Sequence, residues 1–405
     1  MPESLADQVL PLIRTKERDL WEYGRSNEQG RRMLEGLDIL EEAAAQISKP
    51  HPPYPAEEVF DVAHRALNSA VRVLARADDS AGIIGDAVRG LLALHPQLAP
   101  HGRMKGAKLK DWFIKFHDGP GGYFFELDPV QYQESLGKNG LEKIREHFTG
   151  PEAEDNSRRV YFSQRFAVLD RDPEAILVTH LRDRKVPAWY EDAARVLAEI
   201  GEYDRAIEIA HDGYTHGGSP WQQDDCAQYY LTLVAEHQPE RLREETFNVV
   251  TLLPTARTAS QYLELVEDSE KDAARAEMEQ VLAQHPRECA LFRIEHRDDD
   301  LATLRYVDAH LNGEQDMREV LAERLFPTEP AIATQVFLDR IADRLVKAES
   351  KRYRPAARGF VKLIKRARKA EAPEALEVID KFVAGLRQKY SNRPKLMQAL
   401  DEQGL

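Results

Sequence analysis

The amino-acid sequence predicts an all-α fold, built as a solenoid of helical hairpins. Two stretches, 187–200 and 204–214, carry apolar residues at helical spacing on either side of Gly201. Alternation of β-branched and polar residues over strand-length windows is nearly absent, whereas Ala, Leu, Glu and Arg are abundant. A single hairpin cannot bury both of its faces, so we expect neighbouring helix pairs to cover it.

The hairpin near the middle of the chain is the clearest element of the sequence. Pro187 suits a first helical turn, and Gly201 accepts the left-handed backbone that often ends a helix. The spacing of a further set of residues resembles a tetratricopeptide repeat, whose period is about 34 residues. That set is Tyr190, Ala194, Leu197, Gly201, Tyr203, Ala206 and Ala210. The resemblance covers one repeat and implies a stack of helix pairs; an ordinary hairpin in a helical bundle is the alternative.

The chain before residue 149 predicts two helical segments joined by a proline-rich linker. Residues 1–47 form an N-terminal helical segment, in which Pro11 either kinks the first helix or marks its start. The prolines between residues 48 and 58 predict a stiff linker or extended loop, and helical hairpins follow over 57–148. The helices expected in this part cover 4–23, 28–47, 56–77, 81–94, 109–116, 128–137 and 138–148.

The polar stretch 149–159 predicts a second boundary. Beyond it we expect tetratricopeptide-like helical repeats over 158–330, and a C-terminal helical cap with a basic face over 331–405. The helices expected in these two segments cover 160–169, 172–182, 187–200, 204–214, 220–236, 240–253, 258–266, 271–285, 287–294, 299–311, 317–325, 331–349, 355–370, 373–390 and 393–401.

Charge and cysteine content limit the classes of protein. The chain has 405 residues and a formal net charge of −14, which argues against non-specific coating of nucleic acid or of an anionic membrane. Its two cysteines, Cys226 and Cys289, give no disulfide framework. The N-terminus lacks the basic start and apolar core of a signal peptide, and no window is as apolar as a membrane helix. We therefore expect a soluble, cytoplasmic protein.

Several stretches follow one another along the chain: PVQYQESLGKNGLEKIREHF, EIGEYDRAIEIAHDGY, YRPAARGFVKLIKRARKA and FVAGLRQKYSNRPKLMQALDEQGL. Taken in this order, they resemble the helical region of bacterial SWIM zinc-finger proteins. The likeness covers about residues 56–405. The zinc motif of the family pairs closely spaced cysteines with a further Cys and His, and the two distant cysteines of this chain do not supply it. The resemblance therefore implies an α-helical repeat scaffold without the finger and its binding role.

A basic stripe near the C-terminus is the strongest local departure from the acidic average. Its candidate binding residues, Arg358, Lys362, Lys365, Arg366 and Lys369, recur at intervals of three and four and so share one helix face, with Lys365 and Arg366 as alternatives for one position. Three interpretations stay open. The stripe is a solvated face paired with acidic neighbours, a site for an acidic protein segment, or a site for nucleic acid.

Other candidates have plainer explanations in the sequence. His285, Cys289 and His296 suggest zinc, but no fourth ligand is evident, so we expect no metal. The run 298–300 suits a helix cap. The glycine-rich stretch 117–125 lacks the Gly-Lys-Ser/Thr of a phosphate loop and predicts a turn pinned to the core by aromatic residues. We expect the tryptophans to be packing residues; they are Trp21, Trp112, Trp189 and Trp221. An exposed position in a repeat groove is the alternative for Trp221.

These observations predict a non-catalytic protein without a cofactor. No nucleophile-elbow, zinc-protease, phosphate-loop or dinucleotide signature occurs in the chain. We expect a protein–protein interaction scaffold or adaptor that presents a curved surface to a protein partner or peptide segment, with an acidic segment as one candidate. Association with nucleic acid through the C-terminal basic face is the alternative, and we expect no membrane partner.

Overall fold

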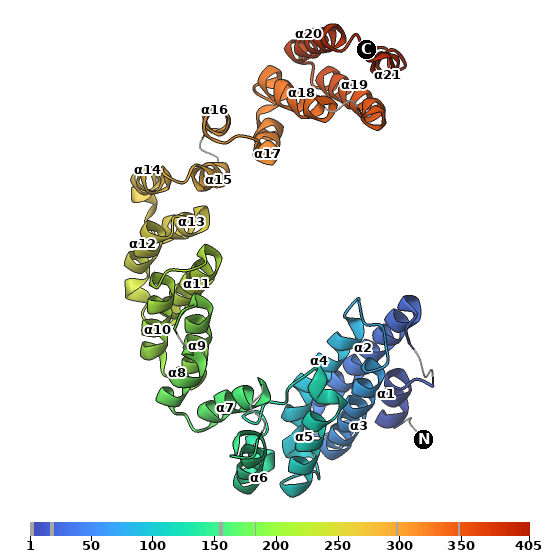
Figure 1. Ribbon diagram of the computed structural model, residues 1–405, viewed down its shortest axis with the longest axis vertical. Coiled ribbons are helices and arrows are strands. Elements are labelled where there is room, and N and C mark those ends of the chain that lie inside the picture. Colours follow the sequence, from blue (N-terminus) through green and yellow to red (C-terminus); the bar gives the residue numbers. More distant parts are fainter. Residues whose placement is uncertain (1–3, 17–19, 154–156, 183, 297–298, 347–348) are drawn as a thin grey trace. The chain divides into compact units, whose positions relative to one another are not determined.

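The computed structural model describes residues 4–16, 20–153, 157–182, 184–296, 299–346 and 349–405. Within these ranges the regular structure is helical, and the extended pairing consists of one isolated bridge between Leu20 and Ala77. The predicted all-α class is therefore confirmed. The chain divides into two compact units, residues 1–213 and 214–405, and the division falls inside one helix of the central hairpin. Figure 1 shows the helices following one another along each unit.

The first unit starts with a cluster of four helices and continues as a succession of neighbours. In the cluster, α2 and α3 both pack on α4, and α1 packs on α2 and α3; from α5 onward each helix packs on the next as far as α9. The helices are α1 (Leu5–Ile13), α2 (Tyr23–Gln46), α3 (Ala56–Leu74), α4 (Ile83–Leu98), α5 (Ala107–Asp118), α6 (Gln133–Thr149), α7 (Ser157–Leu169), α8 (Pro173–Leu181), α9 (Pro187–Glu199) and α10 (Tyr203–Thr215). Short 3-10 turns lie at η1 (Ala99–His101) and η2 (Pro120–Tyr123).

Two helices, α1 and α4, end at other residues than the sequence predicts, and each contains a proline near its end. Pro11 lies inside the last turn of α1, so the prediction that it kinks or starts a longer helix is wrong. Likewise, α4 does not end at residue 94 but continues through Pro96 to Leu98. Near the end of a helix a proline removes one backbone hydrogen bond while most of the ladder stays intact. The linker after α2 and the break at Gly137 of α6, which has a positive φ of 62°, agree with the sequence.

The aromatic residues after α5 do not all pin their turn to the core as expected. Tyr123 is 80% exposed and Phe124 is 50% exposed. Phe116 takes this role instead: its ring lies against Gly121, where an added Cβ would approach the ring within 2.7 Å. The turn therefore depends on the glycine for its close approach to α5.

The central hairpin ends its first helix as the sequence predicts. Gly201 has a φ of 84°, its N–H donates to the Ala198 carbonyl at 2.9 Å, and the N–H of Glu202 donates to the Leu197 carbonyl at 2.9 Å. This pair of bonds is the Schellman arrangement that satisfies the last carbonyls of a helix. The small residues Ala206 and Ala210 of α10 are fully buried.

The second unit is a chain of short helices followed by longer ones. Each packs mainly on its sequence neighbours, and α18, α19 and α20 all contact one another. The helices are α11 (Pro220–His237), α12 (Leu242–Leu252), α13 (Ala256–Glu264), α14 (Lys271–Leu282), α15 (Pro286–His296), α16 (Asp300–His310), α17 (Gln315–Leu325), α18 (Pro330–Val346), α19 (Tyr353–Lys369), α20 (Pro373–Lys389) and α21 (Pro394–Asp401). Short turns precede α12, α14 and α19 at η3 (Pro239–Arg241), η4 (Asp268–Glu270) and η5 (Ser350–Arg352).

Neighbour-on-neighbour packing fits the predicted stack of helical hairpins. Separate apolar clusters serve α12–α15, α15–α18 and α18–α21, as expected when each pair of helices hides the apolar side of the next. None of the helices in the described ranges combines the length and the apolar character needed to cross a bilayer. The four predicted segments and the curved surface expected of a solenoid stay predictions.

Candidate functional site

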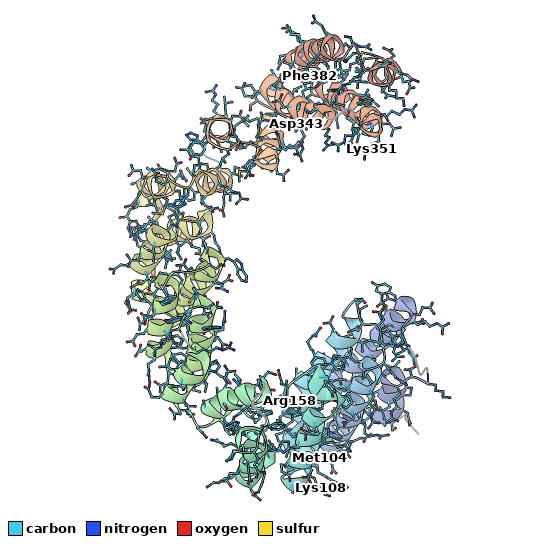
Figure 2. All side chains as sticks on the ribbon, viewed as in Figure 1. Met104, Lys108, Arg158, Asp343, Lys351 and Phe382 are labelled. Carbon is cyan, nitrogen blue, oxygen red and sulfur yellow. The ribbon has the colours of Figure 1, made fainter. Side chains whose placement is uncertain are left out.

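Helix α19 has one buried side and one strongly basic side. Ala357, Phe360 and Ala367 are fully buried, and the Phe360 ring lies 6.1 Å from that of Phe382 on α20, which Figure 2 labels. The helix contains no acidic residue. Its apolar side therefore packs against α18 and α20, and the basic side chains lie on the rest of the helix.

Four of the five predicted residues lie together on the solvent side. Arg358, Lys362, Lys365 and Lys369 are all exposed. At about 100° per residue they fall within a sector of about 60°, opposite Phe360. Among the described residues none of the four has an ion pair or a side-chain hydrogen bond. We call these four residues the α19 basic face.

Arg366 has a different role from the one predicted by the stripe. Its guanidinium pairs with Glu323 of α17 at 2.8 Å and lies over two aromatic rings, 4.0 Å from the centre of Phe326 and 5.1 Å from the centre of Phe337. The side chain therefore fastens α19 to α17 and α18. Of the two alternatives for that position, Lys365 is the one that reaches solvent.

Two arginines near the α19 basic face, Arg340 and Arg354, are paired with acidic residues. Arg340 contacts Asp316 at 3.2 Å and Glu319 at 2.9 Å. Arg354, at the start of the same helix, contacts Glu402 at 3.3 Å. Pairing of this kind is what the solvated-face interpretation predicts for the whole stripe. The α19 basic face lacks it, although the protein carries more acidic than basic residues.

Two of the three zinc candidates, Cys289 and His296, have contacts within the fold. Cys289 is buried in the core of α12–α15, and His296 lies 2.9 Å from the hydroxyl of Ser260, whereas His285 is exposed. In the described ranges no three His, Cys, Asp or Glu side chains lie close enough together to hold a metal ion. Asp299 caps α16 by accepting the Ala302 N–H at 2.9 Å. Asp298 lies outside the described residues.

The tryptophans divide into two groups. Trp112 and Trp189 are partly buried in the first unit, as packing residues should be. Trp21 is 66% exposed and Trp221 is 72% exposed, so the prediction that these two serve as packing residues is wrong. For Trp221, the sequence analysis gave an exposed position as the alternative.

The sequence analysis missed a partly buried chain of polar side chains in the first unit, in which His95 and Tyr132 are buried. Trp112 Nε1 lies 3.1 Å from Asn68 Oδ1, and Asn68 Nδ2 lies 3.1 Å from His64 Nε2. His64 Nδ1 is 3.0 Å from His95 Nε2, and His95 Nδ1 is 2.8 Å from the hydroxyl of Tyr132. The five residues come from α3, α4, α5 and the start of α6, so they join four helices.

Chemistry fixes the direction of this chain. An indole nitrogen can only donate, so the Asn68 oxygen faces Trp112 and the Asn68 amide donates to His64 Nε2. Neutral His64 then carries its proton on Nδ1 and donates to His95, which donates in turn to Tyr132. Burial lowers the pKa of His64, against the charge of Asp61. Burial also lowers the pKa of His95 well below 6.5, so both rings are neutral near pH 7.

Spacing along the chain gave little signal for this network. His64 and Asn68 are four apart, which places them on one face of α3. The other partners lie 31 to 44 positions away along the chain. A buried histidine looks in sequence like any polar residue on a helix. Only the packing of α3, α4 and α5 brings the members together.

No protein-family model matches the chain, and neither the curated proteins nor the solved structures give a match.

Proposed function

We propose that the chain is a non-catalytic helical-repeat adaptor that binds an acidic segment of a protein partner through the α19 basic face. The observation that carries the proposal is four exposed cations on one side of α19 that have no acidic partner among the described residues, whereas Arg340 and Arg354 nearby are paired. Unpaired cations held on one side of a packed helix create a local positive potential. Such a potential selects an acidic partner and speeds its association.

The size and rigidity of the face suit a peptide segment. From Arg358 to Lys369 the helix rises by about 17 Å, a length comparable to five or six extended residues at ~3.3 Å each. The backbone beneath is fixed because Ala357, Phe360 and Ala367 are buried. A partner that places acidic side chains along this length meets all four cations without any rearrangement of α19.

Nucleic acid is the less favoured partner. A net charge of −14 repels a long polyanion, whereas a short acidic peptide feels mainly the local potential. Single-stranded nucleic acid also binds through aromatic platforms on which bases stack. The two aromatic residues of α19, Tyr353 and Phe360, are buried, so the face offers no such platform.

The proposal is tested by fluorescence anisotropy with two labelled probes, a Glu-rich peptide of about 20 residues and a single-stranded RNA of similar charge. We expect the peptide to bind, and the double variant Arg358→Glu/Lys362→Glu to weaken its affinity by about tenfold or more, about 1.4 kcal/mol. The melting temperature should not change, because both side chains are exposed and unpaired.

The matched control is Arg305→Glu/Lys395→Glu, which makes the same charge change at two exposed positions elsewhere in the same unit. It should change the affinity by no more than about twofold. Equal weakening by both double variants would reduce the effect to net charge and refute a specific face. Tighter binding of the RNA than of the peptide would favour the nucleic-acid alternative.

A further inference from the structure

A pocket of about 460 Å³ opens in the first unit between α3, α5 and the turn that follows α5. Its lining includes Arg14, Arg65, Arg72, Lys115, Trp112 and Phe116. A volume of this size is typical of sites for small organic ligands. The pocket lies wholly within the first unit and has no part in the proposed role of α19.

The charged side chains that line this pocket among the described residues all have the same sign. Arg14, Arg65, Arg72 and Lys115 are exposed around it, and the described part of its lining contains no Asp or Glu. In the ranges that the structure describes, none of the four is in an ion pair; Arg14 has a hydrogen bond to the hydroxyl of Ser69 at 3.3 Å. Asp61 is the acidic group whose charge reaches His64. Four cations around one opening, in an acidic protein, call for an anionic occupant.

A second, larger pocket in the same unit does not have this excess of positive charge. It measures about 650 Å³ and has Arg158, labelled in Figure 2, in its wall. Its charges neutralise one another: Lys143 pairs with Glu146 at 2.7 Å, and His147 lies 3.2 Å from Asp118. The smaller pocket is therefore distinguished by its uncompensated charge.

Part of the pocket lining is aromatic and held in place. Trp112 and Phe116 lie one helical turn apart on α5, with ring centres 5.8 Å apart. The indole N–H of Trp112 is fixed by Asn68 at 3.1 Å, and the Phe116 ring rests on Gly121. A preformed apolar wall beside a cluster of cations suits a ligand that has both a flat ring and negative charges.

Three members of the polar chain, His64, Asn68 and Trp112, line the pocket, and their hydrogen bonds leave it a binding site without acid–base chemistry. His64 lines the pocket, but its Nε2 accepts from Asn68 and its Nδ1 donates to His95. Neither ring nitrogen is free to take a proton from a ligand. The role of the chain is to hold Trp112 and α3 in position.

We infer that this pocket binds a small polyanion with an aromatic ring, of the nucleoside diphosphate class. The four cations receive the phosphate oxygens, and the ring lies on Trp112 and Phe116. Arginines from two elements, α3 and the segment after α1, place donors on more than one side of the phosphates. The ring should add affinity beyond that of the phosphates alone.

Isothermal titration calorimetry of the full chain with ADP, and separately with inorganic pyrophosphate, tests this inference in the absence of divalent cations. We expect ADP to bind about tenfold or more tightly than pyrophosphate. The variant Arg65→Glu/Lys115→Glu should weaken ADP binding by about tenfold or more, with an unchanged melting temperature because both residues are exposed and unpaired.

The matched control is Arg31→Glu/Lys138→Glu, which makes the same charge change at exposed positions of α2 and α6 outside this pocket. It should alter ADP affinity by no more than about twofold. Absence of measurable heat with ADP, or equal affinity of the Arg65→Glu/Lys115→Glu variant and the native chain, would overturn the site. Equal affinities for ADP and pyrophosphate would overturn the role of the aromatic wall.

Discussion

Lys365 and Arg366 are adjacent in sequence but lie on opposite sides of the packing boundary of α19. Lys365 is exposed, whereas the guanidinium of Arg366 pairs with Glu323 at 2.8 Å and covers the ring of Phe326. One residue is thus available to a partner, and its neighbour holds two helices together. Within one basic stripe, Lys365 is therefore a candidate for binding, and Arg366 contributes to the stability of the fold.

Replacing each of these two residues by alanine should separate the two roles. Arg366→Ala removes a partly exposed ion pair and two cation–π contacts, so we expect a loss of about 1–2 kcal/mol in the free energy of unfolding. Lys365→Ala should stay within about 0.5 kcal/mol and instead weaken binding of the Glu-rich peptide. Urea denaturation measures the first effect and anisotropy the second. Equal stability losses for the two variants would contradict the assignment.

The hydrogen bond between Trp112 and Asn68 predicts a second contrast. Trp112→Phe keeps an aromatic ring but deprives the Asn68 oxygen of its donor, and we expect a cost of about 1–3 kcal/mol. Trp221→Phe makes the same chemical change at a side chain that is 72% exposed, so it should cost no more than about 0.5 kcal/mol. Urea denaturation followed by circular dichroism measures both. Similar midpoints for the two variants would argue against the polar chain.

Local backbone preferences made most helix ends predictable. Pro187 and Pro373 begin helices, and Gly201 follows the end of one, because these residues restrict or extend the backbone whatever their surroundings. The end of α1 was not predictable in this way. Leu20 pairs with the segment after α3, its N–H donating to the Arg76 carbonyl at 3.2 Å. That contact spans most of the N-terminal cluster, and no local pattern announces it.

The sites were predictable only as far as periodicity reaches. Intervals of three and four placed Arg358, Lys362 and Lys369 on one side of α19, as the structure has them. The same intervals allowed either Lys365 or Arg366, because the choice depends on Glu323 and the aromatic rings of other helices. The pocket beside Trp112 depends in the same way on residues from separate helices. The basic residues of that pocket come from separate parts of the sequence, and only the packing of the helices brings them together.

Acid should destabilise the first unit. Burial lowers the pKa of His64, His95 and His117 below 6.5, that of His117 to about 4. As the pH falls below 6.5, these histidines bind protons in the unfolded chain but stay neutral in the folded chain. The free energy of unfolding therefore decreases toward pH 4, and it keeps its full value above pH 6.5. The shift of His117 alone is worth roughly 3 kcal/mol.

Calorimetric melting at about pH 7.5 and about pH 5 measures this loss. The control variant His51→Gln removes an exposed histidine and should leave the difference between the two temperatures unchanged. A melting temperature that is the same at both pH values would contradict neutral, buried histidines in the folded chain.

The turns after α9 and α19 predict opposite effects on stability for removing a glycine and for introducing one. Both have a residue with positive φ, 84° at Gly201 and 53° at Glu371, and both close with the same two bonds: Ala372 donates to the Ala367 carbonyl at 3.0 Å, and Glu371 donates to the Arg368 carbonyl at 3.2 Å. A side chain in this conformation costs the folded chain about 1–2 kcal/mol. Glycine avoids this cost, but its greater conformational freedom in the unfolded chain offsets part of the gain.

Gly201→Ala should therefore lower the free energy of unfolding by about 1 kcal/mol, and Glu371→Gly should raise it by about 0.5–1 kcal/mol. An added Cβ at Gly201 meets nothing closer than the Arg171 guanidinium at 3.7 Å, so its cost comes from the backbone alone. Thermal denaturation of both variants beside the native chain measures the pair. If both substitutions lowered stability, the side chain of Glu371 would have to contribute more than its backbone strain costs, and the two turns would not be equivalent.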